Sequence, residues 1–178
     1  MQPSGRQLAA APPRWVPWAA TLICSLAVLD ASYLTYAHYS SPKVLYCTIG
    51  GIVNCGAVTT STYSRFLGMP VAVLGLAWAA AMLVLCIPTA WRAGNRWVAR
   101  LRLLGSVAGV AMVFWLVYAE LFKLGLICLY CTFVHILTIA LFVVIAFGMA
   151  LAVPGGTADE AEGAEEAEPR GEPASHAL

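Results

Sequence analysis

The chain has 178 residues, of which 61% are hydrophobic and 11% are charged. Soluble domains carry about 25% charged residues, so this composition excludes an ordinary soluble fold and indicates an integral membrane protein. The formal net charge of +1 hides an asymmetry: residues 1–156 hold nine basic and two acidic residues, whereas residues 157–178 hold one arginine and seven acids.

Four apolar runs have about the 20 residues that a membrane-spanning helix needs. They cover about residues 15–37, 69–88, 103–119 and 124–153. The first could instead be a cleaved signal peptide, because Arg6 and Arg14 precede it, but no clear small-x-small cleavage motif follows Leu29. We therefore predict an all-α integral membrane protein built as a bundle of four transmembrane helices.

Lysine and arginine residues predict the orientation of these runs, since cytoplasmic loops carry an excess of them. The connection 89–102 holds four arginines and segment 1–14 holds two, whereas loop 40–68 holds one lysine and one arginine. We therefore expect a multi-pass protein of the cell membrane (inner or plasma), with both termini and the connection 89–102 cytoplasmic. Loop 40–68 should lie on the outer side.

The two ends of the chain should lie outside the membrane. Segment 1–14 is a cytoplasmic N-terminal segment, and residues 15–153 form a membrane domain. Residues 154–178 are rich in alanine, glutamate, glycine and proline, which predicts an acidic, disordered cytoplasmic tail.

A Cys-x-x-Cys pair, Cys128 and Cys131, lies at the outer end of the fourth run. Thiols in this spacing near a helix N-terminus have lowered pKa values and exchange readily. Such a pair inside a membrane helix indicates a redox couple that meets a lipid-soluble electron carrier.

A second pair, Cys47 and Cys55, lies in loop 40–68 with two glycines between its members. On the outer, oxidising side this pair can form a disulfide. That disulfide either stabilises the loop or is labile and reachable by a partner. Two pairs on one side of the membrane favour a relay, in which the loop pair takes electrons from a soluble thiol protein and passes them to the membrane pair.

Together these motifs resemble the vitamin K epoxide reductases and their bacterial homologues. The resemblance covers about residues 15–150 and is carried by Cys47-x7-Cys55, Ser61 six residues on, Phe66-Leu67-Gly68, and Cys128-Leu129-Tyr130-Cys131. A second type of bacterial quinone-linked oxidase has its Cys-x-x-Cys pair first in sequence. The order here is the reverse, which argues against that type.

The resemblance implies a quinone-dependent enzyme that reoxidises a thioredoxin-like, disulfide-forming protein of the cell envelope. By this analogy Cys47 meets the partner, Cys55 exchanges with Cys128, and Cys131 faces a quinone of the menaquinone, ubiquinone or vitamin K type. No metal is expected. Leu129 stands where many bacterial relatives have proline, which would shift the potential of the pair without removing the chemistry. The chain has no residues left for the fused thioredoxin-like domain of some relatives, so we expect a separate partner protein.

Two other functions stay open. The same four cysteines could reduce a quinone epoxide, with electrons flowing in the same direction. Alternatively, the chain could be a non-catalytic membrane protein in which the disulfides are structural.

Two polar residues are candidates for binding the quinone. His135 lies four residues after Cys131, hence on the same helical face. It would either donate a hydrogen bond or a proton to a quinone oxygen, or be satisfied by a neighbouring helix. Ser61, in the polar stretch 59–62, would either cap a short helix or, by the resemblance, lie beside the membrane cysteines.

The remaining polar and thiol residues of the runs have structural interpretations. Asp30 is expected to make a structural hydrogen bond, and Glu120 and Lys123 to act as interfacial anchors. Cys24 and Cys86 are expected to be lone, small apolar fillers.

Overall fold

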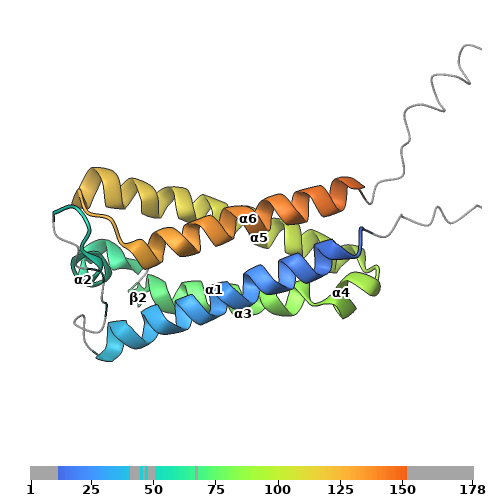
Figure 1. The fold of residues 1–178 in the computed structure, drawn as a ribbon, viewed down its shortest axis with the longest axis horizontal. Coiled ribbons are helices and arrows are strands. Elements are labelled where there is room, and N and C mark those ends of the chain that lie inside the picture. The colour runs from blue at the N-terminus through green and yellow to red at the C-terminus, as the bar shows by residue number, and fades with distance from the viewer. Residues whose placement is uncertain (1–11, 41–44, 46, 48–50, 67, 152–178) are drawn as a thin grey trace, which may run out of the picture.

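The structure is a computed structural model that describes residues 12–40, 45, 47, 51–66 and 68–151. The predicted acidic tail and most of the N-terminal segment 1–14 lie outside the described residues. The described residues are mostly helical, and the long helices form an elongated bundle (Figure 1).

Three helical segments are long and apolar enough to cross a membrane. They are α1 (Trp15–Ser40), α5 (Arg96–Tyr118) with the π-helical turn η3 (Ala119–Leu124) that continues it, and α6 (Leu129–Leu151). The helix of the second apolar run, α3 (Val71–Cys86), has 16 residues. At 1.5 Å per residue it is about 24 Å long, less than the roughly 30 Å of a bilayer core. The helical membrane architecture is confirmed, whereas a fourth span stays a prediction.

A proline ends α3 and reshapes the predicted connection 89–102. Pro88 is the first residue of the short helix α4 (Pro88–Arg92), and Ile87 before it is extended, with ψ of 146°. A residue before proline avoids the helical conformation, so the chain breaks here. The next helix, α5, then begins at Arg96, where the Asn95 side chain accepts a hydrogen bond from Trp97 N–H. The connection is therefore shorter than predicted, and residues 96–102 are helical.

Arg102 is buried inside the bundle, although the sequence placed it in a cytoplasmic connection. Its side chain is 2% exposed, and its Nε and Nη2 donate to the carbonyl of Leu85 at 3.1 and 2.8 Å. The guanidinium also lies 3.6 Å from the ring centroid of Trp91. The break at Pro88 leaves the Leu85 carbonyl without its usual helical donor, and Arg102 satisfies it.

Small residues let the helices approach one another. Helix α1 packs against α3 and α6, and α5 packs against α6 and α3. Four of the seven buried residues of α1 are alanines, and Gly109 of α5 lies directly beneath the indole of Trp78. Close helix contact through small side chains is typical of membrane bundles.

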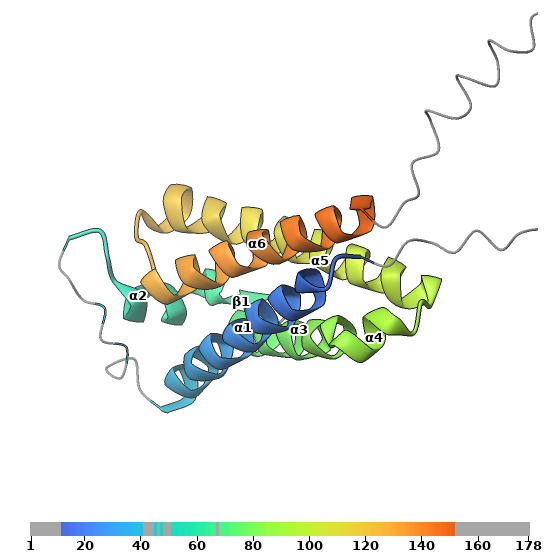
Figure 2. The ribbon, with the colours of Figure 1, turned by 45° about the vertical axis from the view of Figure 1, so that its right-hand side comes forward.

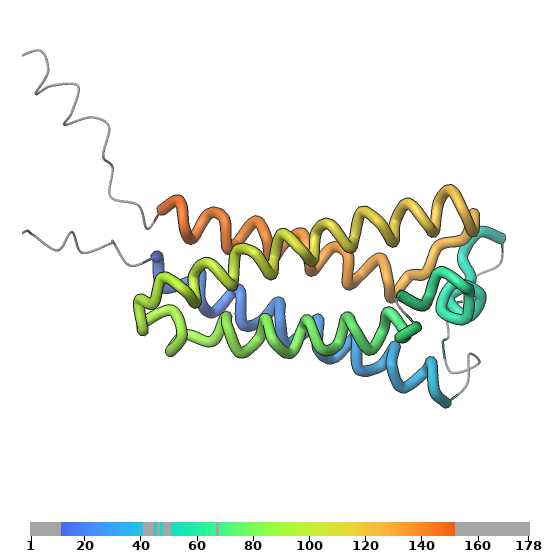
Figure 3. Tube along the Cα trace, turned by 180° about the vertical axis from the view of Figure 1, so that it is seen from behind, coloured from blue at the N-terminus to red at the C-terminus, as the bar shows by residue number. Residues whose placement is uncertain are grey.

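The two ends of the bundle differ. Figures 1 and 2 show α2 and the small sheet at one end, together with the connection from α5 to α6. The start of α1, the end of α6 and α4 lie at the other end, as Figure 3 shows from behind. The predicted loop with a short helix is present as α2 (Cys55–Thr60), followed by a 3₁₀ turn, η2 (Thr62–Ser64).

A two-stranded hairpin leads from this loop into α3. Strand β1 (Arg65–Phe66) pairs antiparallel with β2 (Met69–Pro70), and Phe66 lies opposite Met69. Gly68 in the turn has φ of +83°. Because L residues with a side chain rarely adopt this conformation, glycine is favoured there. This requirement gives a physical reason for the glycine that ends the Phe66-Leu67-Gly68 motif.

An isolated parallel bridge joins the loop to the start of α6. Val53 pairs with Ile127. Asn54 N–H donates to the Ile127 carbonyl at 3.2 Å, and Ile127 N–H donates to the Ile52 carbonyl at 2.9 Å. The bridge therefore fixes the backbone two residues before Cys55 against the backbone one residue before Cys128.

Candidate functional site: two cysteine pairs and an apolar cavity

The two loop cysteines, Cys47 and Cys55, are joined by a disulfide, with their Cα atoms 5.8 Å apart. Both side chains are buried, at 2% and 0% exposure. Cys55 is the first residue of α2, and Asn54 caps that helix by accepting a hydrogen bond from Ala57 N–H at 3.0 Å. Helix α2 and its cap thus hold Cys55 in place.

Cys128 and Cys131 are free thiols at the start of α6. Cys128 caps the helix: its carbonyl accepts from Thr132 N–H at 2.9 Å, and its Sγ accepts from Cys131 N–H at 3.3 Å. The hydrogen bond with the Cys131 side chain is the main cause that lowers the pKa of Cys128 below its ordinary value. The Cys131 N–H adds to this effect, while burial opposes it. The arrangement favours a thiolate on Cys128.

The structure brings the four predicted cysteines together. Cys47, Cys55 and Cys128 belong to one buried cluster with Leu34 and other apolar residues, and Cys131 packs against that cluster. The parallel bridge between Val53 and Ile127 accounts for this convergence. It aligns two segments that are more than 70 residues apart in the chain.

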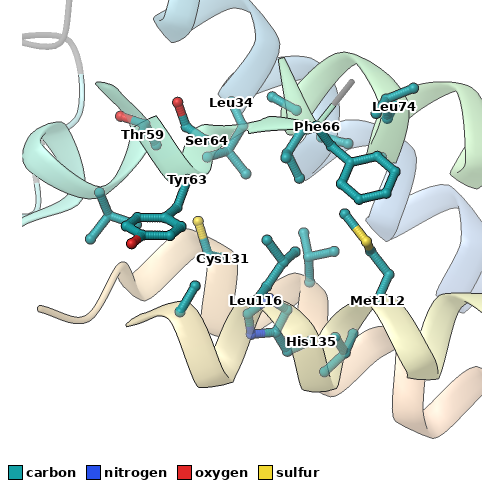
Figure 4. Close-up of a pocket in the computed structure, with 18 of the residues that line it drawn as sticks. Leu34, Thr59, Tyr63, Ser64, Phe66, Leu74, Met112, Leu116, Cys131 and His135 are labelled. Atoms are coloured by element: carbon teal, nitrogen blue, oxygen red, sulfur yellow. The ribbon is translucent and has the colours of Figure 1, made fainter. Parts of the chain in front are cut away.

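An apolar cavity of about 410 Å³ opens beside Cys131. Ligand pockets commonly measure about 300–1,000 Å³ and are mostly apolar. Residues of all four long helices line it, together with residues between Val58 and Phe66 and with Met69. Figure 4 shows the sulfur of Cys131 at this space, with Tyr63 and Phe66 from the loop segment and Met112 and Leu116 from α5. Cys131 therefore borders the cavity, while Cys128 lies in the buried cluster behind it.

Both predicted quinone-contacting residues line the same cavity. His135 is 6% exposed and follows Cys131 by one turn of α6. Ser61 sits at the end of α2, where its Oγ donates to the Val58 carbonyl at 2.8 Å. Ser61 therefore caps the end of α2, as one of the two interpretations expected. The same residue also lines the cavity beside Cys131.

Sequence reasoning assigned neither Trp78 nor Glu120 to the cavity. Trp78 lines it with an indole that donates to the Gly105 carbonyl at 2.9 Å. Glu120 lines it too and is 7% exposed, so it is not the interfacial anchor that was expected, whereas Lys123 is exposed. The π-helical turn that carries Glu120 leaves no pattern in the sequence, although an acid within an apolar stretch is itself a signal of function.

The other intramembrane acid, Asp30, is half-buried on α1. Its Oδ2 atom is buried and has no hydrogen-bond partner among the described residues. The expected structural hydrogen bond is therefore not formed by that oxygen.

Cys24 and Cys86 are buried, as expected, at 1% and 0% exposure. They are not isolated from each other, because both belong to the same buried cluster. This second cluster, which includes Met82 and Leu141, contains none of the four site cysteines. They therefore offer matched cysteine controls for the site.

A model described as the vitamin K epoxide reductase family matches residues 18–146, which is more than half of the chain. The matched range contains both cysteine pairs, Ser61 and His135. Within the ranges that the structure describes, no group of three or more histidine, cysteine or acidic side chains is placed to hold a metal ion.

Proposed function

The chain belongs to the vitamin K epoxide reductase family, and we propose that it oxidises a thioredoxin-like protein by passing electrons to a membrane quinone. The family makes it an oxidoreductase, and its apolar helices together with the family suggest that it is a membrane protein. The proposal adds the direction of electron flow and the roles of the individual cysteines.

One observation supports this proposal above the others. A disulfide, Cys47–Cys55, packs in the same buried cluster as Cys128, and Cys131 of the second pair borders an apolar cavity of about 410 Å³. Thiol–disulfide exchange needs one sulfur to reach another, and an apolar cavity suits a hydrophobic electron acceptor.

The proposed cycle begins when a thiolate of the partner attacks Cys47. Its second thiol resolves the mixed disulfide, which leaves Cys47 and Cys55 as thiols and the partner oxidised. The Cys55 thiolate then attacks Cys128 of an oxidised Cys128–Cys131 pair and releases the Cys131 thiolate. Cys47 attacks Cys55, which restores the loop disulfide and leaves the helix pair reduced.

The reduced helix pair then gives two electrons to the quinone. The Cys131 thiolate adds to the quinone, and Cys128 attacks the Cys131 sulfur, so that the new disulfide forms as the quinol leaves. The two protons of the thiols end on the two quinone oxygens. His135 and Ser61, which line the cavity, are proposed to bind the quinone.

We also propose that the cysteine end of the bundle faces the outside of the cell membrane. The arginines at 92, 96 and 100 are exposed and lie at the opposite end, which suits a cytoplasmic location. A thioredoxin-like envelope protein would then approach the loop end. Because Cys47 is only 2% exposed, we propose that partner binding moves Cys47 toward the surface before the attack.

The test is turnover of the purified protein in detergent with a short-chain quinone and a reduced thioredoxin-like protein. We expect quinone reduction by the wild type and its loss in Cys47→Ala and Cys131→Ala. Cys24→Ala, which removes an equally buried thiol outside the site, should keep wild-type turnover.

The same experiment separates the alternatives. Turnover of a quinone epoxide at a rate above that of the quinone would favour the epoxide reductase function that the family description names. An absence of wild-type turnover with either acceptor would favour structural disulfides instead.

A further inference from the structure

Glu120 is a buried acid that the proposed cycle does not use. It is 7% exposed and lies in the π-helical turn η3, at the end of α5 and close to the start of α6. An acid is costly at membrane depth and is retained there mainly for function. The π-helical turn is rare in proteins and is frequent at functional sites.

The position of Glu120 relates it directly to the reacting sulfurs. It lines a small hollow together with Ile127 and Thr132, the residues that flank the Cys128–Cys131 pair in the chain. It also lines the cavity that Cys131 borders. One carboxyl group therefore lies beside the segment that carries both thiols and beside the space for the acceptor.

Glu120 and His135 also line a second, smaller hollow of about 240 Å³ between α5 and α6. The two polar side chains thus lie between the main cavity and this hollow. Val113 is the third residue that both spaces share, and it is apolar.

Quinone reduction, the last step of the proposed cycle, needs a group that moves protons from sulfur to oxygen. In the proposed cycle, quinone reduction starts from a protein whose loop pair is a disulfide and whose helix pair is reduced. Two thiols and a quinone become a disulfide and a quinol, so two protons must move from sulfur to oxygen. The cavity is apolar, and a positioned carboxyl can carry such a proton.

We propose that Glu120 is the proton-transfer residue of quinone reduction, an inference that rests on the proposed function. As a carboxylate it takes a proton from a thiol of the helix pair, which produces the attacking thiolate. As a carboxylic acid it then gives that proton to a quinone oxygen, and it ends the step as the carboxylate. The second thiol proton reaches the other oxygen, so electrons and protons balance without a further reactant.

The decisive variant is Glu120→Gln, which keeps the size and a carbonyl oxygen of the side chain but cannot transfer a proton. Two rates are measured in the same preparation: thiol exchange from the reduced partner to the helix pair, and single-turnover quinone reduction by the pre-reduced protein. General acid–base groups contribute about 10²- to 10⁴-fold. We expect quinone reduction to slow by at least about 100-fold, with the quinone KM and the exchange rate unchanged.

Lys123→Gln is the matched control, because Lys123 lies in the same turn and is exposed. It should keep both rates. Wild-type quinone reduction by Glu120→Gln, an increase confined to KM, or equal slowing of both rates would each overturn the role of Glu120. If Glu120→Gln does not fold, Glu120→Asp decides: slowing of at least about tenfold in the quinone step alone supports the role, and an unchanged rate overturns it.

These outcomes are separate from the failure of the proposed function. Absence of quinone reduction by the wild type would refute the proposed function. Wild-type turnover with an unaffected Glu120→Gln variant would refute only the role of Glu120.

Discussion

The backbone bridge between the loop and α6 gives a sharp prediction for electron transfer between the two cysteine pairs. Replacing Ile127 by proline removes the N–H that donates to the Ile52 carbonyl at 2.9 Å. The hydrogen bond from Asn54 N–H to the carbonyl of residue 127 can remain. The change therefore weakens the alignment of Cys55 with Cys128 without altering either thiol.

The size of the effect follows from the exposure of the freed carbonyl. Ile52 is 63% exposed, so water can replace the lost donor, and the net cost is that of an ordinary hydrogen bond, about 0.5–1.5 kcal/mol. Since about 1.4 kcal/mol corresponds to a factor of ten, the equilibrium constant between the aligned and unaligned arrangements should fall by roughly 2- to 12-fold. The exchange rate between the pairs should fall, by at most the same factor.

The assay follows disulfide exchange after a reduced thioredoxin-like protein is mixed with fully oxidised protein. Acid quenching and alkylation with a mass-shifting maleimide count the thiols, in a background without Cys24 and Cys86. Ile127→Ala is the control, because it keeps the N–H and should exchange as the wild type does. The reasoning fails if Ile127→Pro exchanges at the wild-type rate, or if Ile127→Ala slows as much.

Two further substitutions test the cavity and the helix cap. In Gly109→Ala the new methyl group would collide with the indole of Trp78, so we expect a destabilisation of about 1–3 kcal/mol and a higher quinone KM. Gly75→Ala is the control for stability, because its methyl group meets nothing within 4 Å and should not destabilise the protein. Equal destabilisation at both glycines would contradict the packing argument. Asn54→Ala removes the cap of α2, at a cost of about 1 kcal/mol. The disulfide of Cys55 should then be reduced more easily in a titration against glutathione, whereas Asn54→Asp, which keeps a capping oxygen, should have the wild-type midpoint. An unchanged midpoint in the alanine variant would show that the cap does not hold the loop.

Much of the helical architecture was predictable, because apolar runs and punctuating prolines act locally. The first and fourth runs begin and end within a few residues of α1 and α6. The exception is Arg102. Its charge predicted a place outside the membrane, but its side chain lies inside the bundle and donates hydrogen bonds to the carbonyl of Leu85, which the break at Pro88 leaves without a helical donor. Such a compensation depends on tertiary packing and leaves no mark in a local pattern.

The site was predictable to the extent that chemistry-bearing residues are rare in an apolar chain. The Cys128–Cys131 spacing and the position of His135 one turn later both point to the face that borders the cavity. Glu120 was misjudged because its helix changes to π-helical hydrogen bonding at Ala119, which re-aims the following side chains. The role of Trp78 depends on the contact with Gly109, which only the fold reveals.

The short length of α3 has a consequence for how a hydrophobic substrate travels. A helix of about 24 Å does not reach across a bilayer core of roughly 30 Å, so either the bilayer thins around it or the hairpin before it lies at the depth of the lipid tails. Phe66 and Met69 of that hairpin are 43% and 50% exposed and also line the cavity. In the second case these side chains meet lipid on one side and the cavity on the other. A quinone would then pass sideways from the membrane to Cys131 without leaving its hydrocarbon surroundings.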